Sequence, residues 1–294
     1  MEDTQVARTI ELNDGRQMPV LGLGTWKCSS LPRAKVQCAV EAAIAAGYRH
    51  IDTAYSYNNE VDIGKALHSK MQQGIIRRQD MFIVSKVEDI PACLNKSLND
   101  LQLDYLDLYL VHFPVGLKVE HNILNSMTEL KLYYPLSYSG MEALQVSGKV
   151  KSIGVSNFNI LQLERLLALC RVPPAVNQVE LHPYLVQTDM IEFCRSKNIA
   201  LTAYSPFGSP ERPPHDPHKL LEDPVVADVA KKHRRSSAQV LLRYHIQQGI
   251  SVIPKSDKPH HILENIFDFS LSEEDMRALE DWTEAGGPAF WMSE

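Results

Sequence analysis

Four residues whose side chains can bind or move protons stand near the ends of successive apolar segments. Asp52, Lys86 and His112 each end or follow a strand-like segment, and Tyr57 lies five residues beyond Asp52. A phenol has a pKa of about 10, too high for an efficient acid at neutral pH, and a neighbouring ammonium lowers it by favouring the phenolate. Asp52 could keep Lys86 charged, and His112 could orient a carbonyl. This tetrad indicates a reaction in which negative charge develops on a carbonyl oxygen.

Each member of the tetrad also has a structural explanation when it is taken alone. An aspartate before a loop often caps a helix, a tyrosine often packs in a core, and a lysine after a strand is commonly solvated. A histidine at a strand end is often only hydrogen-bonded. Together, at consecutive strand ends, they form a coherent proton-transfer group. We expect no metal, because the group lacks the two or three His or Cys ligands that hydrolytic metal sites need.

The elements that must position the tetrad alternate between strand-like and helix-like segments. A hairpin is predicted over 9–20, because Asp14-Gly15 supplies the positive φ of a tight turn. Eight strands separated by helices are expected after it, which indicates a parallel sheet. The expected strands are 20–23, 49–52, 81–85, 105–112, 150–155, 175–180, 199–204 and 250–253. The expected helices are 34–46, 60–71, 92–101, 138–147, 160–169, 188–196, 237–247 and 275–282.

Eight β/α units predict an α/β fold, a (β/α)8 TIM barrel with an N-terminal β-hairpin and an extra C-terminal helix. A doubly wound open sheet is the competing topology, but Gly22-Leu23-Gly24 lacks the third glycine of a dinucleotide fingerprint. Barrel active sites lie at the C-terminal ends of strands, where the tetrad stands. Segments 114–134 and 205–219 are expected loops. We expect residues 1–294 to form a single domain, although length alone also permits two.

Composition narrows the class of protein. The chain has 294 residues, of which 44% are hydrophobic, and a net charge of −6, which argues against a nucleic-acid partner. No apolar stretch approaches the ~20 residues that span a membrane, and the acidic N-terminus lacks the features of a signal peptide. The five cysteines are odd in number and show no CxxC spacing, as expected of free thiols. We expect a cytoplasmic protein that binds neither nucleic acid nor membrane.

Several residues at the ends of the later strands suit a nucleotide cofactor. Lys255 and Ser256 follow the last strand, where barrels often bind phosphate. Tyr204 could stack on a flat ring. A carboxamide group could be held by Ser156, Asn157 and Gln178. A solvated lysine, a packed aromatic residue and helix caps are the structural alternatives.

Six motifs make the chain resemble an aldo-keto reductase of the animal family-1 type. They run in the family's order over nearly the whole chain. The motifs are Gly22-Leu-Gly-Thr-Trp26, Gly47-Tyr-Arg-His-Ile-Asp-Thr-Ala-Tyr-Ser-Tyr57, Leu103-Asp-Tyr-Leu-Asp-Leu-Tyr-Leu-Val-His112, Gly154-Val-Ser-Asn-Phe-Asn159, Asn177-Gln-Val-Glu-Leu-His-Pro-Tyr184 and Ile253-Pro-Lys-Ser256.

The resemblance implies a monomeric (β/α)8 barrel that reduces aldehydes and ketones to alcohols with NADPH, and less readily with NADH. It implies that Tyr57 is the general acid, that Lys86 and Asp52 tune it, and that His112 orients the carbonyl. The cofactor-binding residues that it implies are Gly24, Thr25, Asp52, Ser156, Asn157, Gln178, Tyr204, Ser205, Phe207, Ser209, Lys255, Ser256, His261, Glu264 and Asn265. The implied substrate-binding residues are Trp26, Tyr55, His112 and Phe113.

The sequence also departs from the family pattern. The segment after Lys86 is shorter, Phe113 stands where tryptophan is usual, and the family's C-terminal loop is replaced. Asp257 would repel a phosphate, and Lys258 could compensate. These departures leave two alternatives open: a cofactor-binding barrel with weak or no turnover, and a poorly stable chain. They also leave the carbonyl substrate unidentified.

Overall fold

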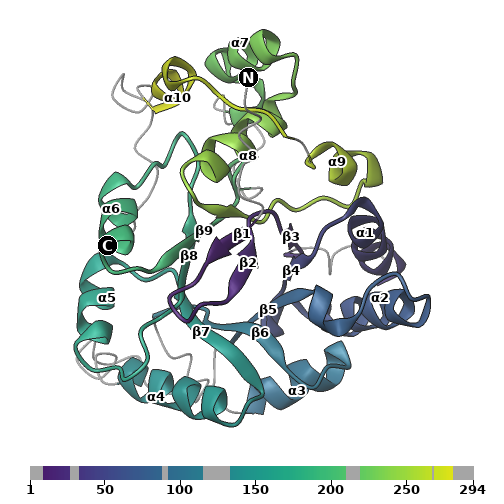
Figure 1. Cartoon of the computed structure of the whole chain (residues 1–294), viewed down its shortest axis with the longest axis vertical. Coiled ribbons are helices and arrows are strands. Elements are labelled where there is room, and N and C mark those ends of the chain that lie inside the picture. Colours follow the sequence, from purple (N-terminus) through teal and green to yellow (C-terminus); the bar gives the residue numbers. More distant parts are fainter. Residues whose placement is uncertain are drawn as a thin grey trace, which may run out of the picture.

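Eight parallel strands form the centre of the molecule and helices surround them (Figure 1). The computed structural model describes residues 9–26, 33–87, 92–114, 133–209, 219–266 and 268–280. In the sheet each strand pairs with its neighbours in sequence, in the order β3 to β10. The strands are β3 (Leu23–Gly24), β4 (His50–Asp52), β5 (Phe82–Val87), β6 (Leu106–Val111), β7 (Val150–Ser156), β8 (Val176–Glu180), β9 (Ala200–Tyr204) and β10 (Ser251–Val252).

The sheet closes on itself between its first and last strands. Parallel bridges join Leu21 to Val252 and Gly24 to Lys255. The amide of Val252 donates to the carbonyl of Val20 at 2.7 Å. A Cβ at Gly24 would lie 2.5 Å from the carbonyl oxygen of Ile253, so only glycine permits this approach. The barrel is therefore confirmed, the open sheet is excluded, and Gly24 of the short glycine motif serves the closure.

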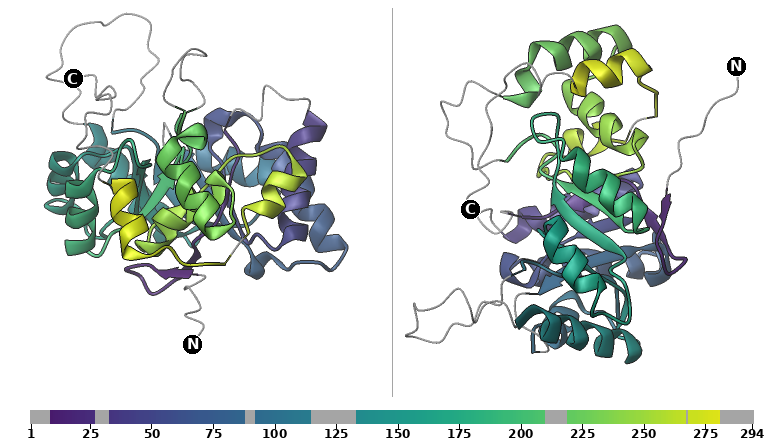
Figure 2. Two further views of the ribbon diagram at one scale, coloured as in Figure 1. Left: turned by 90° about the horizontal axis from the view of Figure 1, so that it is seen from above. Right: turned by 90° about the vertical axis from the view of Figure 1, so that its left-hand side faces the viewer.

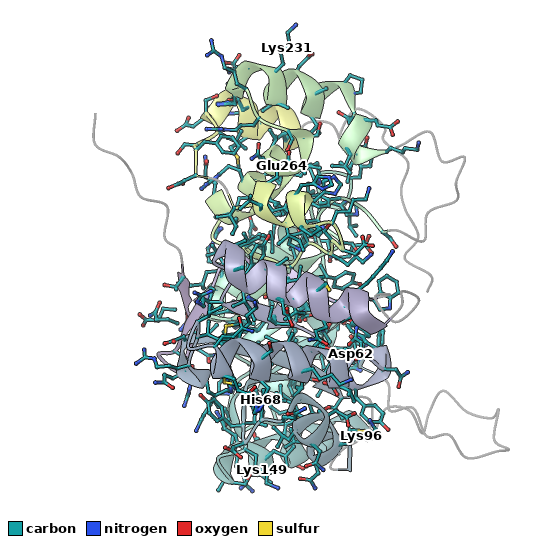
Figure 3. All side chains as sticks on the ribbon, turned by 90° about the vertical axis from the view of Figure 1, so that its right-hand side faces the viewer. Asp62, His68, Lys96, Lys149, Lys231 and Glu264 are labelled. Carbon is teal, nitrogen blue, oxygen red and sulfur yellow. The ribbon has the colours of Figure 1, made fainter. Side chains whose placement is uncertain are left out.

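Helices cover the outside of the barrel. Those that agree with the expected segments to within a few residues are α1 (Arg33–Ala46), α2 (Glu60–Gln72), α3 (Ala92–Leu101), α4 (Tyr133–Val146), α5 (Ile160–Leu167), α6 (Thr188–Ser196), α8 (Ser237–Gln247) and α10 (Glu273–Glu280). Helix α4 begins earlier than predicted, inside residues expected to be a loop. Their outer faces carry exposed charges such as Lys96 on α3 (Figure 3).

Two helices were not predicted, α7 (Pro224–His233) and α9 (Pro259–Glu264). The start of α7 carries a recognisable signal, because the side chain of Asp223 accepts hydrogen bonds from the amides of Val225 and Val226, and Pro224 occupies the first turn. Helix α7 lies beside α8 and α10 on one side of the barrel (Figure 1).

The strands are buried on both faces, which explains their nearly continuous apolar sequences. On β6 the side chains alternate: Leu108 and Leu110 pack in the barrel interior, whereas Tyr109 and Val111 pack against the helices. The hairpin of β1 (Thr9–Glu11) and β2 (Gln17–Pro19) lies across the N-terminal end of the barrel (Figure 2). Its Met18 is fully buried and completes the interior cluster. The residues predicted to be catalytic lie at or near the C-terminal ends of the strands, at the opposite end of the barrel.

Two further sequence expectations concern the chain as a whole. Within the described ranges, no helix is long and apolar enough to cross a membrane. Cys38, Cys93, Cys170 and Cys194 are free thiols. Cys28 lies outside the described residues.

Candidate active site

The parallel barrel brings the tetrad to one end. Asp52 is the last residue of β4, and His112 directly follows β6. Lys86 was expected just after a strand, but β5 extends to Val87, so Lys86 lies within it. Tyr57 ends a 3-10 turn, Tyr55–Tyr57, between β4 and α2. All four residues therefore stand at or near the C-terminal ends of neighbouring strands, where barrel active sites form.

A buried ion pair forms the base of the site. The Lys86 Nζ donates to Asp52 Oδ1 at 2.5 Å and to the carbonyl oxygen of Thr53 at 2.9 Å. Lys86 is fully buried, and burial alone would lower its pKa. The negative charge of Asp52 and the contact with Tyr57 outweigh burial, and the pKa of Lys86 is raised above its ordinary value. Lys86 is therefore held as an ammonium at neutral pH.

Tyr57 and His112 lie in front of this pair. The Lys86 Nζ is 3.5 Å from the Tyr57 hydroxyl. The rings of Tyr57 and His112 meet edge to face, with centroids 5.8 Å apart. Tyr57 is only half-buried, whereas His112 is buried. A carbonyl that approaches from solvent can thus reach the phenol and the imidazole, while the ammonium stays behind them.

The predicted carboxamide residues connect to the tetrad through hydrogen bonds. The Gln178 Nε2 donates to Asp52 Oδ2 at 2.8 Å. The Asn157 Nδ2 donates to the carbonyl oxygen of His112 at 3.0 Å, and the hydroxyl of Tyr204 donates to Asn157 Oδ1 at 2.8 Å. Burial raises the pKa of Tyr204, so its hydroxyl stays a donor.

These residues fit the amide of a nicotinamide cofactor. Within the described parts of the chain, no donor reaches Gln178 Oε1, so this oxygen can accept from a carboxamide NH2. The Asn157 Nδ2 also donates to Ser156 Oγ at 3.3 Å, so both of its hydrogens already have partners. Ser156 donates to the carbonyl of Gln178 at 2.8 Å, which fixes the strand that carries the glutamine. Among these side chains, Gln178 Oε1 is therefore the acceptor that suits the carboxamide predicted from the sequence.

The predicted phosphate residues lie beside the barrel seam. Gly24, which precedes Thr25, is bridged to Lys255. The Lys255 side chain is 38% exposed, and its Nζ lies 3.9 Å from Asp257 Oδ1. Ser256 is buried, and its hydroxyl accepts from the amide of Lys258 at 3.2 Å. A partly exposed ammonium whose carboxylate partner among the described residues lies 3.9 Å away suits a phosphate.

The structure also places the other residues that were predicted to bind the cofactor. His261 is exposed on α9, and Glu264 ends that helix. Asn265 is buried against Tyr48. The segment after β9 contains Ser205, Phe207 and Ser209, all half-buried. Their roles stay predictions.

The predicted substrate residues are aromatic and partly open. Trp26 is 38% exposed and Phe113 is 43% exposed. The ring of Phe113 stacks on that of His112, with centroids 4.5 Å apart. The Lys96 Nζ lies over the ring of Tyr55, 5.4 Å from the ring centroid. Phe113 is thus in direct contact with a member of the tetrad.

Sequence reasoning missed three residues that support the site. The carbonyl of Thr53 holds Lys86, as described above. The carboxyl of Glu60 accepts from Ser85 at 2.7 Å, and burial raises the pKa of Glu60. Asn59 is also buried behind the tetrad. In the sequence, the polar run Asn58-Asn59-Glu60 could have pointed to these supporting residues. The same run is also typical of an ordinary helix start, so it did not distinguish the two.

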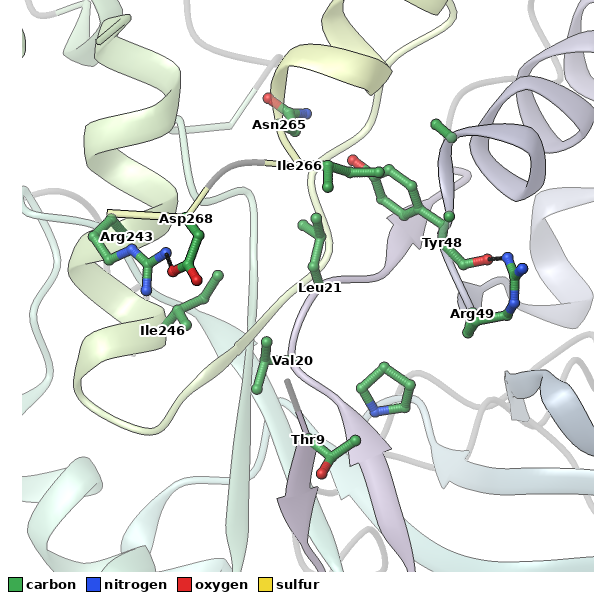
Figure 4. Close-up of a pocket in the computed structure, with 13 residues that line it drawn as sticks. Thr9, Val20, Leu21, Tyr48, Arg49, Arg243, Ile246, Asn265, Ile266 and Asp268 are labelled. Atoms are coloured by element: carbon green, nitrogen blue, oxygen red, sulfur yellow. Dashed lines mark hydrogen bonds and ion pairs between the residues drawn. The ribbon is translucent and has the colours of Figure 1, made fainter. Parts of the chain in front are cut away.

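A hollow of about 500 Å³ lies at the opposite end of the barrel (Figure 4). Leu21, Arg49, Ile246 and Asn265 are among its lining residues. Ile266 and Asp268 also line it, and residue 267 between them lies outside the described residues. We assign it no ligand. Among the residues that the structure describes, no group of three or more His, Cys, Asp or Glu could hold a metal ion.

Comparison with known proteins agrees with this geometry. Residues 20–284 match the family model of the Aldo/keto reductase family. Aldo-keto reductase family 1 member A1-A of Danio rerio is 43% identical, with 93% of this chain and 89% of that protein covered. Aldo-keto reductase family 1 member C1 of Macaca fuscata fuscata is 44% identical, with coverages of 92% and 90%.

A solved structure gives the same result. The aldose reductase of Schistosoma japonicum superposes with a TM-score of 0.84 at 37% identity, and the match covers 94% of this chain and 92% of that one. The barrel, the tetrad and the family match all point to one class of oxidoreductase. The chain therefore belongs to the aldo/keto reductase family.

Proposed function

We propose that the protein reduces aldehyde or ketone carbonyls to alcohols with NADPH, and that Tyr57 is the general acid. The observation that carries this proposal is the buried Lys86–Asp52 pair, whose ammonium lies 3.5 Å from the half-buried phenol of Tyr57. The departures in the loops had left weak turnover open. That alternative is not favoured, because the tetrad is assembled despite them.

Each member of the tetrad has a distinct task in this proposal. The bound cofactor would supply a hydride to the carbonyl carbon. Tyr57 gives its proton to the carbonyl oxygen, and the Lys86 ammonium stabilises the phenolate that remains. Asp52 keeps Lys86 charged and in place. A ring N–H of His112 donates to the carbonyl oxygen and orients it.

The cofactor is held at two places. Gln178 binds the carboxamide, Asn157 joins it by giving up its 3.3 Å contact with Ser156, and Tyr204 packs against the nicotinamide ring. Lys255 and Ser256 bind the phosphate next to the adenosine, which favours NADPH over NADH. Asp257 opposes this preference through its negative charge, and Lys258 offsets it.

The whole chain is further proposed to work as one monomeric barrel domain in the cytoplasm. Barrel closure between Leu21 and Val252 supports a single unit, because the two ends of the barrel sequence depend on each other. Light scattering after size-exclusion chromatography should give the mass of one chain. A dimer mass would contradict the monomer.

A binding titration tests the proposal before any substrate is known. NADPH and NADH are titrated separately and followed by quenching of tryptophan fluorescence, to which Trp26 contributes from the mouth of the site. We expect tight NADPH binding and clearly weaker NADH binding. Carbonyl-dependent oxidation of NADPH is then measured with small aldehydes, sugars, steroids and quinones. A folded protein that binds neither cofactor would refute the proposal.

A further inference from the structure

Asn59 stands where a helix cap is expected but does not cap the helix. It is the residue before α2, and its side chain makes no hydrogen bond to the amides of the first turn. Asparagine at this position normally accepts such a bond, as Asn159 does at the start of α5, where it accepts from Gln162. Asn59 is 1% exposed. Its buried amide must therefore serve another part of the structure.

Both ends of the Asn59 amide bond to loops that carry predicted site residues. The Oδ1 accepts from the hydroxyl of Thr53 at 3.0 Å, and the Nδ2 donates to the carbonyl oxygen of Thr25 at 2.8 Å. The orientation of the amide is determined by Thr25, because a carbonyl oxygen can only accept. Asn59 thus joins the loop after β3 to the end of β4.

These bonds belong to a closed ring that contains the ion pair. The hydroxyl of Thr25 donates to the carbonyl oxygen of Asp52 at 2.9 Å. The Lys86 Nζ donates both to the carbonyl of Thr53 and to the carboxylate of Asp52. The ring therefore runs Asp52, Thr25, Asn59, Thr53, Lys86 and back to Asp52. Within it, Asn59 is the member that connects the two threonines.

We propose that Asn59 is a positioning residue for the reaction: through Thr53 it fixes where the Lys86 ammonium lies beside Tyr57, and through Thr25 it fixes the loop that leads to Trp26. The inference rests on the proposed role of Tyr57. Its physical basis is that Thr53 presents a backbone carbonyl whose direction depends on how its own side chain is held. Small displacements of a catalytic group lower turnover by up to ~100-fold.

The direct test measures the pKa of Tyr57 rather than turnover. The tyrosinate absorbance is titrated in the wild type and in Asn59→Ala, each against the same protein with Tyr57→Phe, so that the difference reports Tyr57 alone. We expect Asn59→Ala to raise the pKa of Tyr57 by about one unit, because a displaced ammonium stabilises phenolate less. The kcat should fall about ten- to hundredfold, and the Kd for NADPH should change less than about threefold.

Asn159→Ala is the matched control, because it removes an asparagine at the start of another helix. It should lower the melting temperature without moving the pKa of Tyr57. Thr53→Val removes only the hydroxyl that bonds Asn59, and it should give a smaller shift in the same direction. It keeps the inference testable if Asn59→Ala does not fold.

Two outcomes separate this inference from the proposed function. An unchanged Tyr57 pKa in both Asn59→Ala and Thr53→Val would overturn the positioning role, whether or not the wild type is active. Absence of carbonyl reduction by the wild type would instead refute the proposed function, and it would be seen before any variant is made.

Discussion

Asp52, Lys86 and Gln178 hold one another in the barrel interior, whereas Lys255 and Asp257 lie at the surface beyond β10. The first group is joined by hydrogen bonds of 2.5 and 2.8 Å between buried side chains. The second has one ion pair at 3.9 Å between partly exposed side chains. The proposed catalytic end is therefore held together by buried protein contacts, whereas the proposed phosphate end has few protein contacts. Chemistry and cofactor affinity should respond to different substitutions.

Tyr57→Phe should separate the two regions most strongly. Loss of the proton donor should lower kcat by about 10²–10⁴, the usual contribution of a general acid. The Kd for NADPH should stay within about threefold, since the phenol does not hold the cofactor phosphate. Steady-state kinetics and fluorescence titration measure the two quantities. Tyr105→Phe, the same change beside the N-terminal end of β6, is the control. If Tyr57→Phe lost affinity for NADPH together with kcat, the two regions would not be independent.

His245, a buried histidine on α8, tests whether water reaches the interior beside that helix. Burial, with His182 nearby, lowers the pKa of His245 to about 3. Below its ordinary pKa of about 6.5, the unfolded chain takes up a proton that the folded protein refuses. The free energy of unfolding should therefore decrease as the pH is lowered. At a pH two units below 6.5, His245 alone should lower it by about 2.7 kcal/mol.

His245→Gln isolates this effect from that of the carboxylates. Urea unfolding is measured at neutral pH and at about two units below the ordinary histidine pKa. The variant should lose less stability than the wild type over this interval. If both proteins lost the same free energy of unfolding, His245 would not be held neutral in the folded protein, and water would reach its side chain.

Lys255→Met should weaken NADPH binding about tenfold, as expected for one charge-assisted hydrogen bond at a partly exposed site. The NADH affinity and the kcat should change little, because the tetrad does not depend on Lys255. Lys149→Met, which removes an exposed lysine just before β7 (labelled in Figure 3), is the charge-matched control. A loss of kcat in Lys255→Met at saturating cofactor would argue against two independent regions.

Asp257→Asn should have the smallest effect and the opposite sign. Removal of its charge should tighten NADPH binding about two- to fivefold, because the partner of Lys255 is lost and repulsion of the phosphate ends. The gain should shrink at high salt, which screens exposed charges. Titrations at low and high ionic strength measure it. Weaker binding would mean that Asp257 holds Lys255 in place.

The fold was largely predictable because each strand and most helices carry a local signal. Apolar segments bounded by helical ones indicated the parallel strands, and positions at strand ends located the tetrad. Helix α7 was missed although Asp223 and Pro224 mark its start, because no element was assigned between the expected loop 205–219 and the expected helix 237–247. Helix α9 is only six residues long and has too few turns to show a helical period.

The contacts within the site were less predictable than its members. Gln178 and Asp52 come from β8 and β4, which are not neighbours in the sheet, so no local pattern indicates that they bond. Asn59 looks like an ordinary cap in the sequence, and only the structure shows that its amide turns inward. Lys86 was placed after its strand because the apolar alternation ends before it, although pairing with Leu110 continues.

The seam between β3 and β10 has a consequence for synthesis of the chain. All other strand pairs join segments that are close in sequence, but Leu21 pairs with Val252, and its partner strand is only two residues long. Such a distant pairing carries the largest loop-closure cost and forms late. During synthesis, the strand edge around Gly22 and Gly24 stays unpaired until residue 255 has left the ribosome. The nascent, open-sided barrel is thus the form of this protein most exposed to aggregation, and the one that chaperones have most reason to bind.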